Sequence, residues 1–144
     1  MNRLRGVITG VERCGSIALI DVDAVGHRLT ATLVGAGVDG DTAGWQPGSP
    51  VLLLFAETEV ALAKDLSGLI SMRNRLCCEL RVIERGAVLT KVTLDVAGTT
   101  LVSIITTRSA NSLMLQVGDA VEALVKANEM HVVPDQRLPS RGTR

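Results

Sequence analysis

Five side chains in the second half of the chain could together bind a small anion. Ser71 and Arg73 are two residues apart, so on an extended backbone both project to the same side. Thr106 and Ser109 lie at the start of a predicted short helix, where unpaired backbone N–H groups favour negative charge. Lys126 closes a predicted strand. All five side chains donate hydrogen bonds, and two of them carry positive charge.

The chemistry of this donor set indicates an oxyanion ligand. No carboxylate or histidine accompanies the donors, so the group is suited neither to binding a metal cation nor to proton transfer. Charge-assisted hydrogen bonds from arginine and lysine supply affinity, while fixed hydroxyls and backbone amides gauge the size of the ligand. A plainer alternative stays open, because such residues at strand ends and helix caps are usually solvated or capping residues. We expect no enzyme, since no pair of nucleophile and base is visible.

An internal repeat singles these donors out. Asn2-Arg3-Leu4 returns 72 positions later as Asn74-Arg75-Leu76, and a second register, 70 positions apart, matches Gly48 with Gly118. What both copies share is expected to be fold, and what only one copy has is a candidate for function. The first copy begins too late to include a Ser-x-Arg pair. Its residues at the other donor positions carry no donor side chain: Val34 for Thr106, Gly37 for Ser109 and Ala56 for Lys126.

Composition limits the possible partners. The 144 residues include 15 Lys plus Arg and 15 Asp plus Glu, so there is no basic field of the kind that nucleic-acid binding needs. The three cysteines fit neither a disulfide framework nor a zinc site. No apolar run approaches the roughly 20 residues of a membrane helix, and no leader is visible. We therefore expect a cytoplasmic protein that binds neither nucleic acid nor membrane.

The dominant pattern along the chain is the two-residue period of β-strands. Strands are predicted over residues 6–11, 17–22, 28–34 and 51–54, and over residues 79–83, 89–96, 100–105 and 120–126. Each copy ends in one more short strand, near residues 60–63 and 130–133, and a short helix is predicted over residues 109–115. Gly-bearing breaks about every ten residues indicate an all-β fold with a small antiparallel barrel in each half.

The repeat also sets the predicted domain boundaries. One domain covers residues 1–65, a second covers residues 66–134, and residues 135–144 form a polar, flexible tail. Residues 35–40 spell G-x-G-x-x-G, but no crossover helix of a dinucleotide site can follow, so a mobile loop is predicted there.

Four motifs in the second copy resemble the Mop domain of molbindins. They are Ser71-Met72-Arg73-Asn74-Arg75-Leu76, the turn Gly86-Ala87-Val88, the strand Ser103-Ile104-Ile105, and Val125-Lys126-Ala127. The family pattern has Ser-Ala-Arg-Asn-Gln-Leu, Gly-Ala-Val, Ser-Ile-Ile and Val-Ile-Lys-Ala in the same order and spacing. The whole chain is similar to a tandem, or di-Mop, molbindin, with the weaker match in residues 1–64.

The resemblance implies two tandem OB-like β-barrels that bind molybdate or tungstate at interfaces between Mop domains. In the family, the Ser-x-Arg pair and the lysine come from one domain, and the Thr and Ser of the helix start come from its neighbour. The site residues implied here are Ser71, Met72, Arg73 and Lys126 on one side, and Thr106, Thr107 and Ser109 on the other. Met72 and Thr107 are expected to contribute through the main-chain amides beside them.

The resemblance further implies a homo-oligomer, a trimer in the first place and a dimer as the alternative. The anion is held by hydrogen bonds alone, with no direct metal ligand and no organic cofactor. The implied function is storage or buffering of the oxyanion. The alternative is a sensory module of a molybdate-responsive transcription regulator or transport ATPase.

Overall fold

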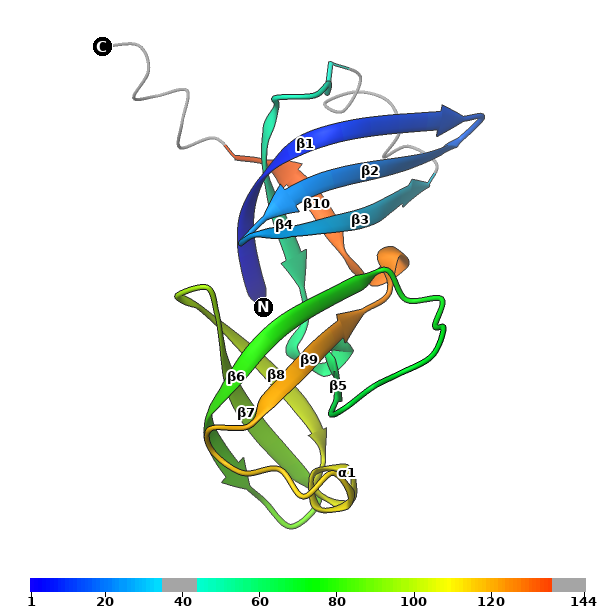
Figure 1. Ribbon diagram of the computed structural model, residues 1–144. Coiled ribbons are helices and arrows are strands. Elements are labelled where there is room, and N and C mark those ends of the chain that lie inside the picture. The colour runs from blue at the N-terminus through cyan, green and yellow to red at the C-terminus, as the bar shows by residue number, and fades with distance from the viewer. Residues whose placement is uncertain (35–43, 136–144) are drawn as a thin grey trace, which may run out of the picture.

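The computed structural model describes residues 1–34 and 44–135 of the chain (Figure 1). The loop predicted over residues 35–40 lies outside the described residues, and so do residues 136–144 of the predicted tail.

Each copy forms a curled antiparallel meander followed by a short 3-10 helix and a last short strand. The first copy contains β1 (Asn2–Cys14), β2 (Ile17–Ala24), β3 (His27–Val34), β4 (Pro50–Phe55), η3 (Glu57–Glu59) and β5 (Ala61–Ala63). The second copy contains β6 (Asn74–Arg85), β7 (Leu89–Val96), β8 (Thr99–Thr106), α1 (Thr107–Ser112), β9 (Ala120–Val125), η4 (Ala127–Glu129) and β10 (His131–Pro134). The predicted all-β class is confirmed.

The two copies exchange their last strands. One sheet has the order β10-β4-β1-β2-β3 and the other the order β5-β9-β6-β7-β8. The exchange is symmetric in register, because Ala61 pairs with Leu124 while His131 pairs with Leu54, two pairs that the repeat makes equivalent. Figure 1 shows β10 among the strands of the first copy. Each sheet is therefore completed by the other copy. The predicted domain boundaries separate the two sequence repeats, whereas each sheet contains strands from both repeats.

The first strand of each copy is much longer than predicted, because it pairs with two partners in succession. β1 pairs with β4 through its first half and with β2 through its second half, and β6 does the same with β9 and β7. The register shifts between Ile8 and Gly10, and at the matching place between Leu80 and Val82. Such bulges bend a strand and increase its twist, which lets one strand serve two faces of a barrel. The predicted ranges cross the bulge and miss both ends of each strand, where only one of the two partner strands continues the pairing.

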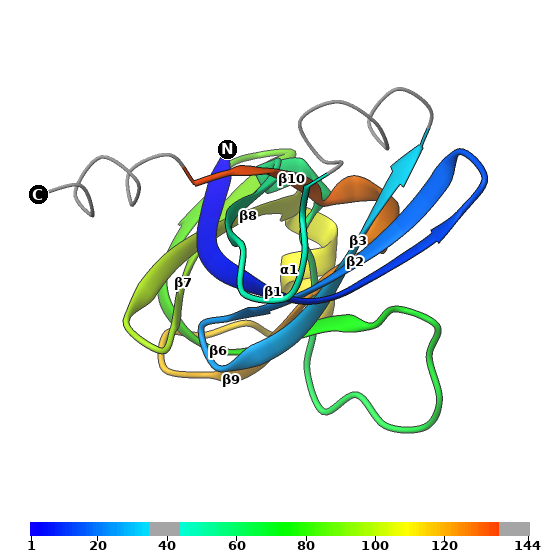
Figure 2. The same cartoon turned by 90° about the horizontal axis from the view of Figure 1, so that it is seen from above.

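Alternating side chains of both meanders form one continuous buried core. The largest fully buried side chains include Phe55, Leu53 and Ile20 in the first copy and Leu76 and Leu94 in the second. Burial of aliphatic side chains of this size stabilises the fold by about 1.5 to 3 kcal/mol each. Figure 2, seen from above, shows the two sheets stacked over one another, with the segment between β5 and β6 looping out to one side.

Two buried asparagines hold the copies together. The Asn74 side chain donates to the Thr30 carbonyl at 2.9 Å and accepts from the Thr30 amide at 2.7 Å. Asn2 makes the same pair of bonds to Val102, at 2.8 and 2.9 Å. Each side-chain amide thereby makes the two hydrogen bonds that a neighbouring strand would make to the edge strand of the other copy. Asn74 is fully buried and Asn2 nearly so, so their removal would leave unpaired backbone groups.

The helix of the second copy begins earlier and ends earlier than predicted. α1 covers Thr107–Ser112, and Thr106 is its N-cap. The chain leaves the helix through Met114, which adopts a left-handed φ of 51°. A methionine in that conformation is not a stop that sequence rules identify, because glycine usually fills it. Gly118, beyond the predicted end of the helix, lies in the following turn.

Candidate functional site

The first group of candidate donors lies where β8 ends and α1 begins. The Thr106 hydroxyl accepts a hydrogen bond from the Ser109 amide at 3.1 Å, and it donates to Ser109 Oγ at 2.8 Å. Both residues are exposed. The structure therefore brings these two hydroxyls together at the surface, and the cap bond fixes their relative position.

Thr107 is engaged differently. Its hydroxyl donates to the Gly86 carbonyl at 2.8 Å, so the contact at 2.8 Å with Thr90 Oγ1 must be donated by the buried Thr90. Its amide donates to the Val88 carbonyl at 2.8 Å. Thr107 thus ties α1 to the turn between β6 and β7. Its own amide is occupied within the chain, which leaves Thr106 and Ser109 as the donors of this group that face solvent.

The second group lies at the junction of β6 and β9. Ser71, Met72 and Arg73 lead directly into β6, and Lys126 directly follows β9. Asn74 pairs with Val125, so the register places Arg73 and Lys126 at the ends of neighbouring strands. Ser71, Arg73 and Lys126 are exposed, and within residues 1–34 and 44–135 their side chains have no hydrogen-bond or ion-pair partner. Met72 is half-buried.

The two groups lie at opposite ends of the second barrel. β6 begins at Asn74, beside Lys126, and ends at Arg85, beside the strand pair that places Leu89 opposite Thr106. A strand of 12 residues has a path of roughly 35 to 40 Å. Figure 1 shows α1 at the lower end of this barrel and the junction of β9 and β10 at its upper end, against the first copy. The seven predicted residues therefore do not converge within one chain.

Within residues 1–34 and 44–135, neither group meets its complement in the neighbouring copy of the same chain. η3 of the first copy packs on β8, and a hollow of about 410 Å³ opens there beside Thr106 and Ser109. Its other wall contains Thr58 and Glu59, and the residue before η3 is Ala56, at the position of the lysine. The carboxylate of Glu59 repels a dianion. η4, with Lys126 as its N-cap, packs in turn on β3, which ends at the apolar Val34.

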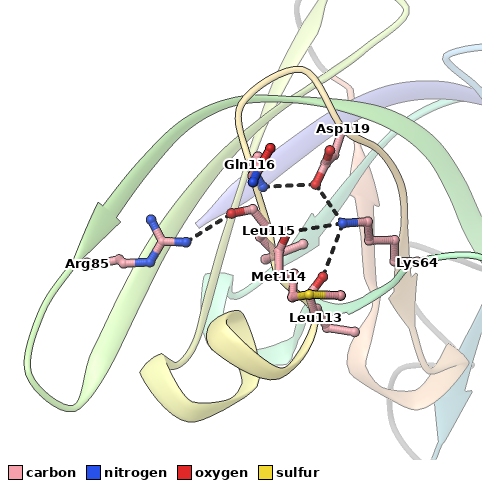
Figure 3. A network of polar contacts seen from close by, with 7 residues as sticks. All are labelled: Lys64, Arg85, Leu113, Met114, Leu115, Gln116 and Asp119. Carbon is pink, nitrogen blue, oxygen red and sulfur yellow. Dashed lines mark hydrogen bonds and ion pairs between the residues drawn. The ribbon is translucent and has the colours of Figure 1, made fainter.

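A lysine from the first copy supports the loop that follows α1. Lys64 Nζ donates to the carbonyls of Leu113 and Met114 at 3.2 and 3.1 Å, and it pairs with Asp119 Oδ2 at 3.0 Å (Figure 3). Asp119 also accepts from the Gln116 amide at 2.9 Å. Carbonyls at a helix C-terminus lack intrahelical donors, so a cation there is stabilising.

The hydrogen bonds from the Gln116 amide and then from Lys64 lower the pKa of Asp119 below its usual range. Arg85, at the end of β6, donates to the Leu115 carbonyl at 2.9 Å from the other side of the same loop (Figure 3). The loop carrying residues 113–119 is thus fixed by both copies.

No role for Lys64 was predicted from the sequence. The repeat does distinguish this ion pair. Pro134 and Ser49 occupy the positions that match Lys64 and Asp119, so neither charge is shared by the two copies. The pairing of Lys64 with this loop depends on the strand exchange, which the sequence did not reveal. The exchange carries β5, and the lysine that follows it, onto the second sheet.

The cysteines offer no metal centre. Across residues 1–34 and 44–135, no group of three or more His, Cys, Asp or Glu side chains could hold a metal ion. Cys78 is buried, and burial raises the pKa of its thiol to about 11, whereas Cys14 and Cys77 are exposed. The Cys77 amide donates to His27 Nε2 of the first copy at 3.1 Å.

No helix among the described residues is long and apolar enough to cross a membrane.

Comparison with known proteins agrees with this architecture. Residues 70–132 match the TOBE domain. A solved structure of the cytoplasmic molybdate-binding protein ModG, with molybdate bound, matches with a TM-score of 0.84 and 27% identity. The match covers 91% of this chain and 94% of that chain.

The chain is also similar to parts of two larger proteins. The molybdenum import ATP-binding protein ModC of Brucella abortus is 34% identical over 125 residues, which are 86% of this chain. The molybdenum transport protein ModE of Herbaspirillum seropedicae is 35% identical over 75 residues, or 51% of this chain. The chain spans about a third of ModC and less than a third of ModE, 32% and 28% respectively.

The chain belongs to the molbindin family of Mop, or TOBE-like, domains. The expected fold of two tandem OB-like barrels is confirmed by the match to ModG over nearly the whole length of this molbindin. The residues that match the TOBE domain are those of the second copy, which carries all the donor side chains.

Proposed function

We propose that this molbindin binds molybdate or tungstate and serves as a cytoplasmic store or buffer of the oxyanion. One observation carries the proposal: the second copy holds the donor set of a Mop domain on a fold that matches molybdate-bound ModG over 91% of the chain. Hydrogen bonds and charge suffice to hold such a dianion. No catalytic group and no organic cofactor is part of the proposal.

The proposed site is shared between chains. Ser71, Arg73 and Lys126 of one chain form one half, and Thr106 and Ser109 of another chain form the other. Support comes from their placement at opposite ends of the second barrel, and from Ala56 and Val34 occupying the first-copy positions of Lys126 and Thr106. Backbone amides beside Met72 and Thr107 complete the shell in this proposal.

A homo-oligomer follows from a shared site. A cyclic arrangement gives every chain one neighbour on each side, so each half-site meets one complement. We propose a trimer, with a dimer as the alternative, and native mass spectrometry with and without molybdate distinguishes the two.

Calorimetric titration of the full chain with molybdate, tungstate and sulfate tests the function. We expect saturable binding of molybdate and tungstate and weaker binding of sulfate. Arg73→Ala should weaken molybdate binding at least tenfold, since a charged hydrogen bond contributes about 1.5 to 3 kcal/mol. Arg28→Ala, on the exposed surface of the first copy, is the matched control. An absence of molybdate heat would refute the proposal, and equal affinity for sulfate would remove its specificity.

Mixing two variants tests whether the site is shared. Chains with Arg73→Ala and chains with Thr106→Ala should each bind poorly alone. Unfolded together and refolded as mixed oligomers, they should regain about a quarter of the sites, because a random cyclic arrangement pairs intact halves at that frequency. A site built within one chain would regain none.

The sensory alternative is supported by the similarity to ModC and ModE. In that case, the chain would act as the oxyanion-responsive part of a larger regulator or transporter. Molybdate would then change the oligomeric state or the conformation markedly, which size-exclusion chromatography with light scattering detects. A store would bind with no such change.

A further inference from the structure

The first copy, which lacks the anion donors, places one cation at the C-terminal end of the helix that carries Ser109. Lys64 follows the exchanged strand β5, and its Nζ donates to the carbonyls of Leu113 and Met114 at 3.2 and 3.1 Å. Its third contact is Asp119 Oδ2 at 3.0 Å. An ammonium group has three N–H donors, so one loop of the second copy takes all of them.

A short series of hydrogen bonds connects Lys64 with the hydroxyl pair of the proposed molybdate site. The Leu113 carbonyl accepts from Lys64, and the Leu113 amide donates to the Ser109 carbonyl at 3.0 Å. The Ser109 amide donates to Thr106 Oγ1 at 3.1 Å, and the Thr106 hydroxyl donates to Ser109 Oγ at 2.8 Å. One residue, Leu113, therefore stands between Lys64 and the anion donors.

The helix α1 has little other support. It has six residues, fewer than the roughly 12 to 15 that an isolated helix needs to be even marginally stable. Ala110 is its only buried residue. Thr106 caps its N-terminus, whereas the carbonyls at its C-terminus lack intrahelical donors. Lys64 supplies donors and a favourable positive charge at this end, so the position of Ser109 depends on it.

The loop that Lys64 holds is strained at Met114. This residue has a φ of 51°, a left-handed conformation that is unfavourable for a residue with a side chain. Its side chain is 72% exposed, so packing does not compensate for the strain. The first copy has Gly44 at the matching position. Without the bond from Lys64 to its carbonyl, Met114 is expected to relax, and the end of α1 would move with it.

We propose that Lys64 is a positioning residue of the proposed molybdate site. It does not touch the anion. By holding the loop after α1, it keeps the hydroxyls of Thr106 and Ser109 where the oxyanion needs them. This inference rests on the proposed function, and it assigns the first copy a part in anion binding. The strand exchange brings Lys64 to the second sheet, whereas Pro134 takes the matching position on the first sheet.

Calorimetric titration of the full chain with molybdate tests the effect on affinity. Lys64→Met removes the donors but keeps an apolar side chain of similar length, and it should weaken binding about three- to tenfold. Lys64→Arg keeps a cation that can donate to the same carbonyls and carboxylate, so its affinity should stay within about twofold of the parent chain. Thermal melting verifies that each variant is folded.

A matched control separates position from charge, because loss of any positive charge weakens the attraction of an anion. Arg28→Met removes the same charge and an ion pair of the same length, 3.0 Å to Asp23, but it lies in β3 of the first copy. We expect affinity close to that of the parent chain in this variant. Equal losses in Arg28→Met and Lys64→Met would contradict the positioning role.

Amide hydrogen exchange measures the positioning without molybdate. The amides of Ser109 and Leu113 are both hydrogen-bonded in the parent chain. Lys64→Met should speed the exchange of these two amides at least tenfold, while the amides of buried residues in β7, such as Val92, should keep their rates. Faster exchange of all these amides to the same extent would show a general loss of stability and would overturn the inference.

The affinity measurements distinguish failure of this inference from failure of the proposed function. If the parent chain binds molybdate and folded Lys64→Met binds it equally well, only the positioning role fails. If Lys64→Arg binds as weakly as Lys64→Met, the hydrogen bonds of the cation are not what positions the site. If the parent chain binds no molybdate, the proposed function fails, and the positioning role fails with it.

Discussion

The two copies have the same scaffold but differ in what they offer to an anion. The second copy has Ser71, Arg73 and Lys126 at one end of its barrel and hydroxyls at the other end. The first copy keeps the asparagine that joins the copies but has Ala56 where the second has lysine. Scaffold positions are retained because both barrels must close, whereas donor positions on the surface can change without loss of the core.

The comparison also shows that the copies are not independent. Each sheet is completed by the last strand of the other copy, and each interface is held by one buried asparagine. A first copy without donors therefore still has a structural role. It supplies β5 and Lys64 to the second sheet, and so supports the loop that follows α1.

The largest effect should come from disrupting an exchanged strand. Val132 in β10 is buried against the first copy, so Val132→Asp should destabilise the chain by about 3 kcal/mol or more, because an unpaired charge enters the core. Urea denaturation measures this loss. His131→Asp, at the exposed neighbour, should have little effect. Equal effects of the two variants would mean that β10 contributes little to the first sheet.

Removal of the asparagine clamps should have the next largest effect. Asn74→Ala leaves the amide and carbonyl of Thr30 without partners, and we expect a loss of about 2 kcal/mol in the free energy of unfolding. Asn2→Ala should cost about the same, since it makes the equivalent bonds to Val102. A large difference between the two would show that the two interfaces are unequal, contrary to their matching geometry.

Exchange of the lysine position between the copies sharpens the functional contrast. Lys126→Ala should weaken molybdate binding by about 1.5 kcal/mol or more, while Ala56→Lys in the first copy should not create a further site, because Met1 occupies the position of Arg73. Calorimetric affinity and stoichiometry report both. A gain of sites in Ala56→Lys would show that the first copy needs only one donor to bind the anion.

The smallest effect concerns pH. The hydrogen bonds of Asp119 lower its pKa in the folded chain. Its contribution to stability is therefore complete above the ordinary carboxylate pKa of about 4, and it is lost as the pH falls through the lowered folded value. In Lys64→Met, melting temperatures between pH 6 and about pH 3 should decline less steeply than in the parent chain. An identical decline would mean that Lys64 does not stabilise the ionised Asp119.

Much of the fold was predictable from residue patterns. Period two and regular glycine turns predicted strands at every position where the structure has one, because alternating burial leaves a local record in the sequence. The long β1 and β6 were underestimated at both ends, where pairing with β4 and β2, or with β9 and β7, extends them beyond the predicted ranges. The end of α1 was misplaced because Met114, rather than a glycine, takes the left-handed conformation.

The sequence by itself determined the repeat, the all-β class and the set of donors, because each depends on residue types at fixed spacings. Only the tertiary structure decided which copy completes which sheet, and that the donor groups lie at opposite ends of one barrel. Strand partners are chosen by contacts between residues far apart in the chain. Because the two copies are repeats, β4 and β9 offer equivalent edges to β5 and β10, and residue patterns do not distinguish the two pairings.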